Sequence, residues 1–327
     1  MNDRVFILGT GLLGTSVGLA LRAAGFSGSI VGWNRGPAQA QTALAMGALD
    51  SAAPDPLEAA RAGDIVLIAV PILATLDWME KLAPVLGPDQ LVTDVGSTKR
   101  EIAAAALRLY NQPGRAAFLP GHPMAGKEKG GAALADANLF RGAVWLFTRA
   151  PGAEGTGFSP YDAGTESNGA IDVKGTGFSP YDDSPEDIGA SAPGRISPRA
   201  AELINEWRLW VARFGAKIVD LDPARHDELV AWVSHLPQFV STAMSALLEE
   251  QVGNAPELKD IGGRALREMT RLGASPYSMW RDIALTNSEA IDAVLHALEQ
   301  RLAHLRENLR TPGLRDEFEQ ANRFRRE

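Results

Sequence analysis

The sequence predicts an α/β protein, in which a doubly wound parallel sheet of the Rossmann-like kind is followed by an all-helical domain. Short apolar runs alternate with helical patterns over the first 150 residues, which is typical of β-α-β units. A glycine-rich turn directly follows the first run, and only helical patterns occur after residue 221. We therefore expect one domain at residues 1–221 and a second at residues 222–327.

Each expected strand is a short apolar run bounded by turn residues. We expect strands at Val5 to Leu8, Ser29 to Trp33, Ile65 to Val70, Leu91 to Val95, Ala117 to Pro120, Ala143 to Phe147 and Ala216 to Leu221. Apolar residues at helical spacing predict helices at 198–214, 226–250, 257–272, 275–286 and 288–309, separated by Gly, Pro and Asn. The broad apolar faces of the last four indicate a homodimer through the helical domain.

One stretch differs in composition from the rest of the chain. Residues 151–194 hold eight acidic residues against the single base Lys174, and the octapeptide GTGFSPYD occurs twice in them, starting at Gly155 and Gly175. A polar segment rich in Gly and Pro buries too little apolar surface to offset the entropy of ordering it. We expect an inserted, disordered loop, and a docking element built on its Phe and Tyr residues is the alternative.

Composition excludes several classes of protein. The longest apolar run, at 65–76, is too short to span a membrane and contains Pro71, and the N-terminus has no signal-peptide layout. Cysteine is absent, which excludes disulfides and thiolate chemistry, so we expect a cytoplasmic protein. The formal net charge of -8 falls almost wholly within 151–194, and no basic patch favours nucleic acid.

The glycine-rich turn predicts a dinucleotide site. Gly9, Thr10, Gly11, Leu12, Leu13 and Gly14 form a G-x-G-x-x-G between a strand and a helix. Gly9 permits the tight turn, Gly11 lets the backbone approach a pyrophosphate, and Gly14 allows the helix to pack closely on the strand. The free N–H groups at the helix N-terminus would bind the anion.

The end of the second expected strand bears on the choice of cofactor. An acid that accepts the ribose hydroxyls of NAD is usual there, whereas this chain has Asn34 followed by Arg35. An arginine can pair with a 2′-phosphate, so the sequence favours NADP over NAD. A solvated Arg35 with NAD bound is the alternative.

Two further segments follow expected strands, where ligands bind in open α/β sheets: TDVGSTK at 93–99 and PGHPMAGKE at 120–128. His122 lies in the second of them. An imidazole titrates near neutrality, so His122 could act as a general base, although a histidine that satisfies a backbone carbonyl is the alternative.

These segments also carry a family resemblance. Four more segments belong with them: GTGLLG, AVP at 69–71, SHLP at 234–237 and MTRLGASPYSMWRDI at 269–283. Together these segments resemble the motifs of the prephenate/arogenate dehydrogenase family of tyrosine biosynthesis, and they occur in the same order along the chain. The resemblance covers nearly the whole chain outside the insert. It implies NAD(P)-dependent oxidative decarboxylation of prephenate and/or arogenate, and it adds Val70, Pro71 and Ser97 to the cofactor site.

The resemblance also assigns roles. His122 would accept the proton of the ring hydroxyl, and Ser97 would contact that hydroxyl and orient His122. Arg271 would bind a substrate carboxylate with its planar guanidinium group. Trp280 would line the site, with a place in the core as the alternative.

Further positions carried over from the family are Ser234 and His235, on a helix that Pro237 would kink. Many members that use prephenate have histidine directly after SHLP, whereas this chain has Gln238, so the resemblance leaves prephenate and arogenate both open. Glu128 would modulate ligand binding or face solvent. No role is assigned to the remaining histidines, and no metal site is expected.

Two other functions remain open. A related β-hydroxyacid or imine dehydrogenase would share the architecture, but such enzymes usually place a lysine in the helical domain as the proton carrier. A non-catalytic NADPH-sensing protein would share the fold with a damaged substrate site, whereas Ser97, His122, His235 and Arg271 are all present.

Overall fold

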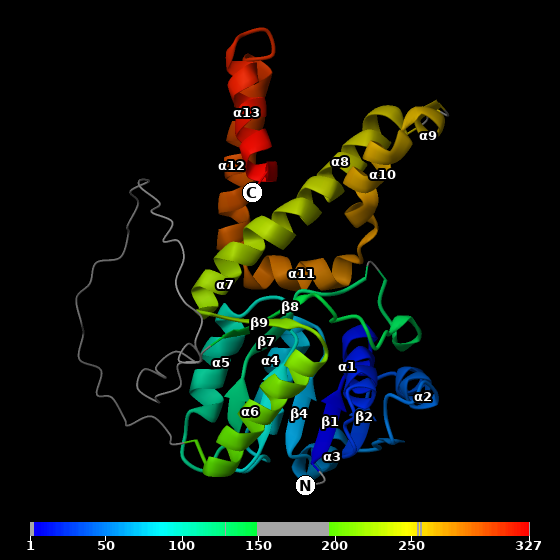
Figure 1. Cartoon of the computed structure of the whole chain (residues 1–327), viewed down its shortest axis with the longest axis vertical. Helices are drawn as coiled ribbons and strands as arrows, with labels where there is room; N and C mark the ends of the chain where they lie inside the picture. The colour runs from blue at the N-terminus through cyan, green and yellow to red at the C-terminus, as the bar shows by residue number, and fades with distance from the viewer. Residues whose placement is uncertain (1–2, 128, 149–195, 254, 256, 327) are drawn as a thin grey trace, which may run out of the picture.

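Residues 3–127, 129–148, 196–253, 255 and 257–326 are described by the computed structural model (Figure 1). The insert at 151–194 and Glu128 lie outside these ranges. Six parallel strands form the main sheet in the order β3-β2-β1-β4-β5-β6. They are β1 (Arg4–Leu8), β2 (Ser29–Trp33), β3 (Ser51–Ala52), β4 (Ile65–Ile68), β5 (Leu91–Asp94) and β6 (Ala117–Leu119).

Both faces of the sheet are covered because its strands are apolar on both sides. On β1, Val5 and Ile7 join one core, and Phe6 and Leu8 join the other. The first core is closed by α1 (Leu12–Ala23), α2 (Pro37–Ala45) and α6 (Pro198–Arg213). The second is closed by α3 (Pro56–Ala62), α4 (Ile72–Leu82) and α5 (Arg100–Tyr110).

A second, three-stranded sheet is not predicted from the sequence. It consists of β7 (Gly121–Pro123), β8 (Val144–Thr148) and β9 (Lys217–Leu221). Strand β7 is antiparallel to β8, and β9 is parallel to it. The short 3-10 helix η1 (Ala132–Leu134) lies between β7 and β8 in the chain. The second sheet holds the segment that follows β6 close to the end of β5.

The C-terminal part of the described chain is helical, as predicted. Its elements are α7 (Pro223–Val230), a π-helical turn η2 (Ala231–His235), α8 (Leu236–Val252), α9 (Glu257–Ile261), α10 (Gly263–Thr270), a 3-10 turn η3 (Arg271–Ala274), α11 (Tyr277–Thr286), α12 (Ser288–Glu307) and α13 (Gly313–Arg326). The single helix expected at 226–250 is therefore divided at η2, and α13 was not expected. None of the described helices is long and apolar enough to span a bilayer.

Helix α11 joins the helical half to the sheet. It lies across the upper edge of the sheet, while α8 with α10 and α12 with α13 extend away from it as two arms (Figure 1). Ile283 of α11 and Ile291 of α12 belong to the second core. The hydroxyls of Thr98 and Thr286 lie 2.8 Å apart, so α11 also contacts the loop after β5 directly.

The glycine-rich turn has the geometry that its sequence predicts. Gly9 has φ 106, and a Cβ atom there would lie 2.3 Å from the carbonyl oxygen of Ala69. A Cβ atom on Gly14 would lie 2.0 Å from the carbonyl oxygen of Gly9. At Gly11, however, a Cβ atom would meet nothing within 4 Å. Gly9 and Gly14 are thus required by packing, whereas Gly11 leaves open space beside the N-terminus of α1.

This contrast predicts different effects of alanine at the two positions. Gly14→Ala should lower the melting temperature by about 5 °C or more, since it forces the helix away from the turn. Gly11→Ala should change the melting temperature by about 1 °C at most and weaken dinucleotide binding by about 10-fold or more, because its methyl group occupies the space a pyrophosphate needs. Thermal unfolding and titration calorimetry would measure both. Equal losses of stability in the two variants would contradict this account.

Candidate active site

The residues expected to bind the cofactor lie together at the carboxyl ends of β1, β2, β4 and β5. Asn34 follows β2, and its side-chain amide donates to the carbonyl of Gly36 at 3.1 Å. Arg35 is exposed beside it, and Val70 and Pro71 connect β4 to α4. Ser97 is half-buried in the loop after β5. This edge is where open α/β sheets bind ligands.

His122 is held inside the protein close to the same edge. It lies in β7, opposite Leu146 of β8, and its side chain is almost completely buried. Its Nδ1 atom lies 2.9 Å from Nε2 of His226. Ser97, within the described part of the chain, makes no side-chain hydrogen bond to His122. His226 therefore engages one ring nitrogen of His122, and within the described part of the chain Nε2 is the nitrogen left for a ligand.

His226 is in turn bonded to Asp227 next to it on α7. Its Nδ1 atom lies 2.8 Å from Oδ1 of Asp227, and both side chains are fully buried. Asp227 also accepts the backbone N–H groups of Lys99 at 2.7 Å and Arg100 at 2.9 Å, at the start of α5. The carboxylate thus joins the first helical element of the C-terminal half to the loop after β5.

His226 is one of the histidines for which no role is predicted from the sequence, because it lies on a helical pattern among charged residues. In the structure it is buried instead. Pro223, His226, Asp227 and Val230 are the buried residues of α7. Their spacing of three, four and seven residues marks one face of a helix, so the periodicity of this segment was a signal that could have identified His226.

A fully buried ion pair fixes the backbone in front of His122. Lys99 Nζ lies 2.6 Å from Oδ2 of Asp94, and neither side chain is exposed. Asp94 also accepts the backbone N–H groups of Gly96 at 2.7 Å and Gly121 at 3.0 Å. Removing one member of a buried pair leaves an uncompensated charge, so this pair is a structural requirement of the site.

Burial keeps His122 and His226 neutral. It lowers the pKa of His122 well below its usual value, and the neighbouring His226, Lys99 and His235 act in the same direction. Burial also lowers the pKa of His226, although the hydrogen bond to Asp227 opposes this effect. At neutral pH, His122 can therefore accept a proton.

His235 and Trp280 lie beside this pair. The Nδ1 atom of His235 is 3.3 Å from the side-chain nitrogen of Asn287, and its ring meets the ring of Trp280 edge-on at 5.8 Å. Trp280 packs in the same way against Phe239. Trp280 is half-buried against the second core and lies next to His235. Ser234 is half-buried one residue before His235 in η2.

Gln238 and Arg271 are joined through the backbone. The side-chain amide of Gln238 donates to the carbonyl of Leu272 at 2.7 Å and to the hydroxyl of Thr242 at 3.1 Å, while its oxygen accepts the hydroxyl of Ser275 at 3.0 Å. Arg271 begins the same turn, η3, with an exposed side chain. Gln238 thus holds the turn that presents Arg271.

A parallel sheet with a glycine turn at the start of α1, a buried histidine at its carboxyl edge and a helical second half are together typical of dinucleotide-dependent dehydrogenases. Two family models match the chain. They are prephenate dehydrogenase, nucleotide-binding domain, at residues 17–156, and prephenate dehydrogenase, dimerization domain, at residues 222–323. The chain belongs to the prephenate dehydrogenase family.

Individual relatives agree with this assignment. The chain is 27% identical over 292 residues to the prephenate dehydrogenase of Bacillus subtilis, which covers 89% of this chain and 66% of that protein. It is 25% identical to the cyclohexadienyl dehydrogenase of Zymomonas mobilis, over 92% of this chain and 87% of that protein. The chain thus spans only about two thirds of the length of the Bacillus relative.

Solved structures share the fold. Prephenate dehydrogenase from A. aeolicus, in complex with hydroxyphenyl propionate and NAD+, superposes with a TM-score of 0.72 at 25% identity, covering 99% of this chain and 95% of that one. Synechocystis arogenate dehydrogenase superposes with a TM-score of 0.68 at 27% identity, covering 98% of each chain.

The buried histidines predict a pH-dependent stability. Burial lowers the pKa of His235 to about 4 from an ordinary value near 6.5. Above pH 6.5, neither the folded nor the unfolded state binds this proton. Below it, the unfolded chain gains the proton first, so His235 alone should lower the free energy of unfolding by up to about 1.4 kcal/mol per pH unit until about pH 4, in addition to what His122 and His226 contribute. Urea unfolding between pH 7.5 and 5 would measure this slope.

His235→Leu should reduce the slope by about one proton, whatever its effect on stability at pH 7.5. His296→Gln is the matched control, since His296 is exposed on α12. Identical slopes for the wild type and His235→Leu would show that His235 titrates normally in the folded protein.

Proposed function

We propose that the chain catalyses the NAD(P)-dependent oxidative decarboxylation of prephenate and/or arogenate, giving 4-hydroxyphenylpyruvate and/or tyrosine. The observation that carries the proposal is the buried, neutral His122, whose Nδ1 is bonded to His226 and whose Nε2 is left for a ligand. His122 lies beside the end of β5, at the same edge of the main sheet as the glycine-rich turn. Family membership and the names of the relatives support the same reaction.

In this reaction the ring carbon that bears the hydroxyl loses a hydride, and the bond to the ring carboxylate breaks to release CO2. The cofactor supplies the acceptor for the hydride. His122 takes the hydroxyl proton at Nε2, which we expect to contribute about 10²- to 10⁴-fold to the rate. Loss of the carboxyl group leaves an aromatic ring, so the overall step is strongly driven.

The remaining residues of the site bind and orient the substrate. Arg271 is an exposed residue of the turn that Gln238 holds, and its planar guanidinium group suits bidentate binding of a carboxylate. Ser97 lies in the loop after β5 and contacts the hydroxyl group of the substrate. Gln238 is occupied by bonds to its own protein, so it orients the turn and does not select between the two side chains of prephenate and arogenate.

The cofactor is held by the turn Gly9 to Gly14, with Asn34, Arg35, Val70, Pro71 and Ser97 around it. The open space at Gly11 fits a pyrophosphate beside the N-terminus of α1. Beyond β2, Arg35 is exposed and no carboxylate stands in the usual ribose position. This arrangement favours NADP over NAD.

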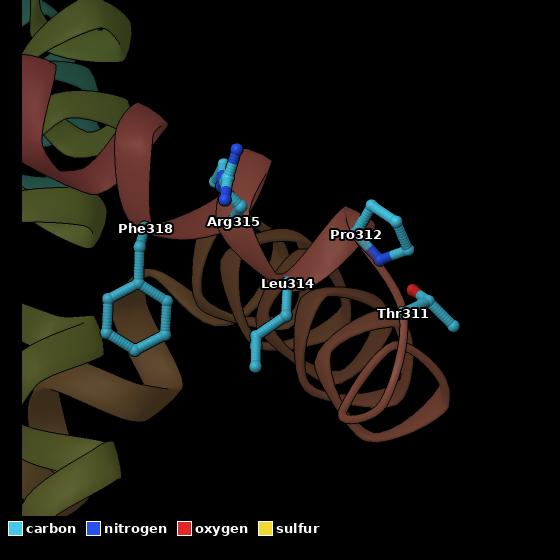
Figure 2. Close-up of a pocket in the computed structure, with 5 residues that line it drawn as sticks. All are labelled: Thr311, Pro312, Leu314, Arg315 and Phe318. Atoms are coloured by element: carbon cyan, nitrogen blue, oxygen red, sulfur yellow. The ribbon is translucent and has the colours of Figure 1, made fainter.

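The helical half supports a homodimer. Exposed apolar side chains occur along both arms and α11, including Leu247, Ile261, Met269, Tyr277, Leu285, Leu302, Phe318 and Phe324. A cavity of about 540 Å³ where α12 turns into α13 is lined by none of the candidate active-site residues. Two of the residues that line it, Leu314 and Phe318, extend to the same side of α13 (Figure 2). Apolar surface of this extent is typical of subunit interfaces. The cysteine-free sequence supports a cytoplasmic location.

Incubating the purified chain with prephenate or arogenate and with NAD or NADP, while following the absorbance of the reduced nicotinamide, tests the proposal. At least one of the four combinations should show turnover. His122→Asn should then lower kcat by about 10²- to 10⁴-fold with little change in KM for the substrate, because it removes the base and leaves the binding groups in place.

His296→Gln should behave as the wild type in the same assay. Absence of turnover in all four combinations would refute the proposed function. Full activity of His122→Asn would refute the role of His122.

The cofactor assignment has its own test. Arg35→Ala should raise KM for NADP by about 10-fold or more and change KM for NAD by less than about 2-fold, because only NADP carries the phosphate that Arg35 would bind. Arg61→Ala is the control, since Arg61 is an exposed arginine on α3, before β4 and hence at the opposite edge of the sheet. Equal effects of Arg35→Ala on both cofactors would argue against NADP recognition by this residue.

A further inference from the structure

We propose that His226 and Asp227 are positioning residues that hold His122 in the tautomer with its proton on Nδ1, so that Nε2 is the base. The expected effect of these residues on the reaction rate rests on the proposed function. The tautomer itself can be tested without any substrate.

The direction of each hydrogen bond follows from Asp227. Each of its oxygens already accepts a backbone N–H, from Lys99 and from Arg100, as an ionised carboxylate does. An ionised carboxylate can only accept, so Nδ1 of His226 must donate to it across 2.8 Å. A neutral His226 then carries its lone pair on Nε2.

The same reasoning extends to His122. Nε2 of His226 can only accept, so Nδ1 of His122 must donate to it across 2.9 Å. A neutral histidine has one N–H and one lone pair, so the lone pair of His122 lies on Nε2. That nitrogen is the one left for a ligand. With the opposite tautomer, Nε2 would carry a hydrogen and could not take a proton from a hydroxyl.

The charges of the buried cluster fit this role. Lys99 and Asp94 form a pair with no net charge, and Asp227 adds one negative charge. The three histidines of the cluster, His122, His226 and His235, are neutral because burial lowers their pKa values. When His122 takes up the substrate proton, the cluster becomes neutral overall. His226 connects the new positive charge to Asp227 through two hydrogen bonds, so the charge is balanced without contact with solvent.

Substitutions at His226 can separate the two hydrogen bonds. The oxygen of glutamine reaches about as far as Nε2 of histidine, so His226→Gln can still accept from His122. The amide nitrogen of asparagine corresponds to Nδ1, so His226→Asn keeps a donor for Asp227 but cannot reach His122. Asp227 itself is unsuitable as the test residue, because it also bonds the backbone of Lys99 and Arg100.

The decisive experiment is nitrogen-15 NMR of the full-length protein labelled at its histidine rings. The chain has only 5 histidines, and His122→Asn identifies the signals of His122. In the wild type we expect a protonated Nδ1 and an unprotonated Nε2 at neutral pH. In His226→Asn we expect a shift toward the tautomer protonated on Nε2, and in His226→Gln the wild-type tautomer. A wild-type His122 protonated on Nε2 overturns the inference, whatever the enzyme assay gives.

Kinetics then test the consequence. His226→Asn should lower kcat by about 10²- to 10⁴-fold, with KM for cofactor and substrate within about 3-fold of the wild type. His226→Gln should recover about 10-fold or more of that loss. Equal kcat values for the two variants overturn the inference, because a merely structural role for His226 would not distinguish them. The wild-type spectrum decides the tautomer even if either variant fails to fold.

Discussion

The rest of the site depends on the hydrogen bonds that the buried carboxylate of Asp227 accepts. This carboxylate receives hydrogen bonds from the start of α5, which belongs to the sheet, and from His226, which belongs to the helical half. Three donors converge on one buried side chain, so the positions of the two halves are fixed relative to each other at the point where chemistry is proposed. Asn287 adds a bond to the backbone carbonyl of Asp227 and brings in the start of α12.

Burial has opposite effects on the two kinds of charged group in this cluster. It keeps the histidines neutral, which a base requires, and it makes the carboxylates costly unless each is fully paired. The carboxylate of Asp94 is paired with Lys99 and accepts two backbone N–H groups. The carboxylate of Asp227 accepts two backbone N–H groups and a hydrogen bond from His226. Rigidity of the site therefore follows from the need to satisfy these groups rather than from apolar packing alone.

Much of this arrangement could be predicted from sequence, because it rests on local patterns. The apolar run of β1 and the glycine turn after it identify the sheet and the cofactor edge, and GHP identifies His122. Strand β7 could not be predicted, since Gly-His-Pro has low strand propensity and its position depends on tertiary contacts, namely its pairing with β8 and the hydrogen bond from Gly121 to Asp94. The bonds of Gln238 to the turn of Arg271 likewise depend on tertiary contacts that no spacing reveals.

The π-helical turn η2 has a consequence for how this segment can vary. His235 follows His226 by nine residues, and at about 100° per residue a regular helix would place the two on opposite faces. The wider turn accommodates one additional residue, so that both histidines face the same buried cluster. Loss of one residue from 231–235 would turn this segment into a regular helix in which eight residues separate the two histidines, about 80° apart around the helix axis, so both would stay on one side. Gain of one residue would instead turn His235 about 100° further from His226. The segment that contains the exposed Trp232 and Val233 should therefore tolerate loss of a residue better than gain of one.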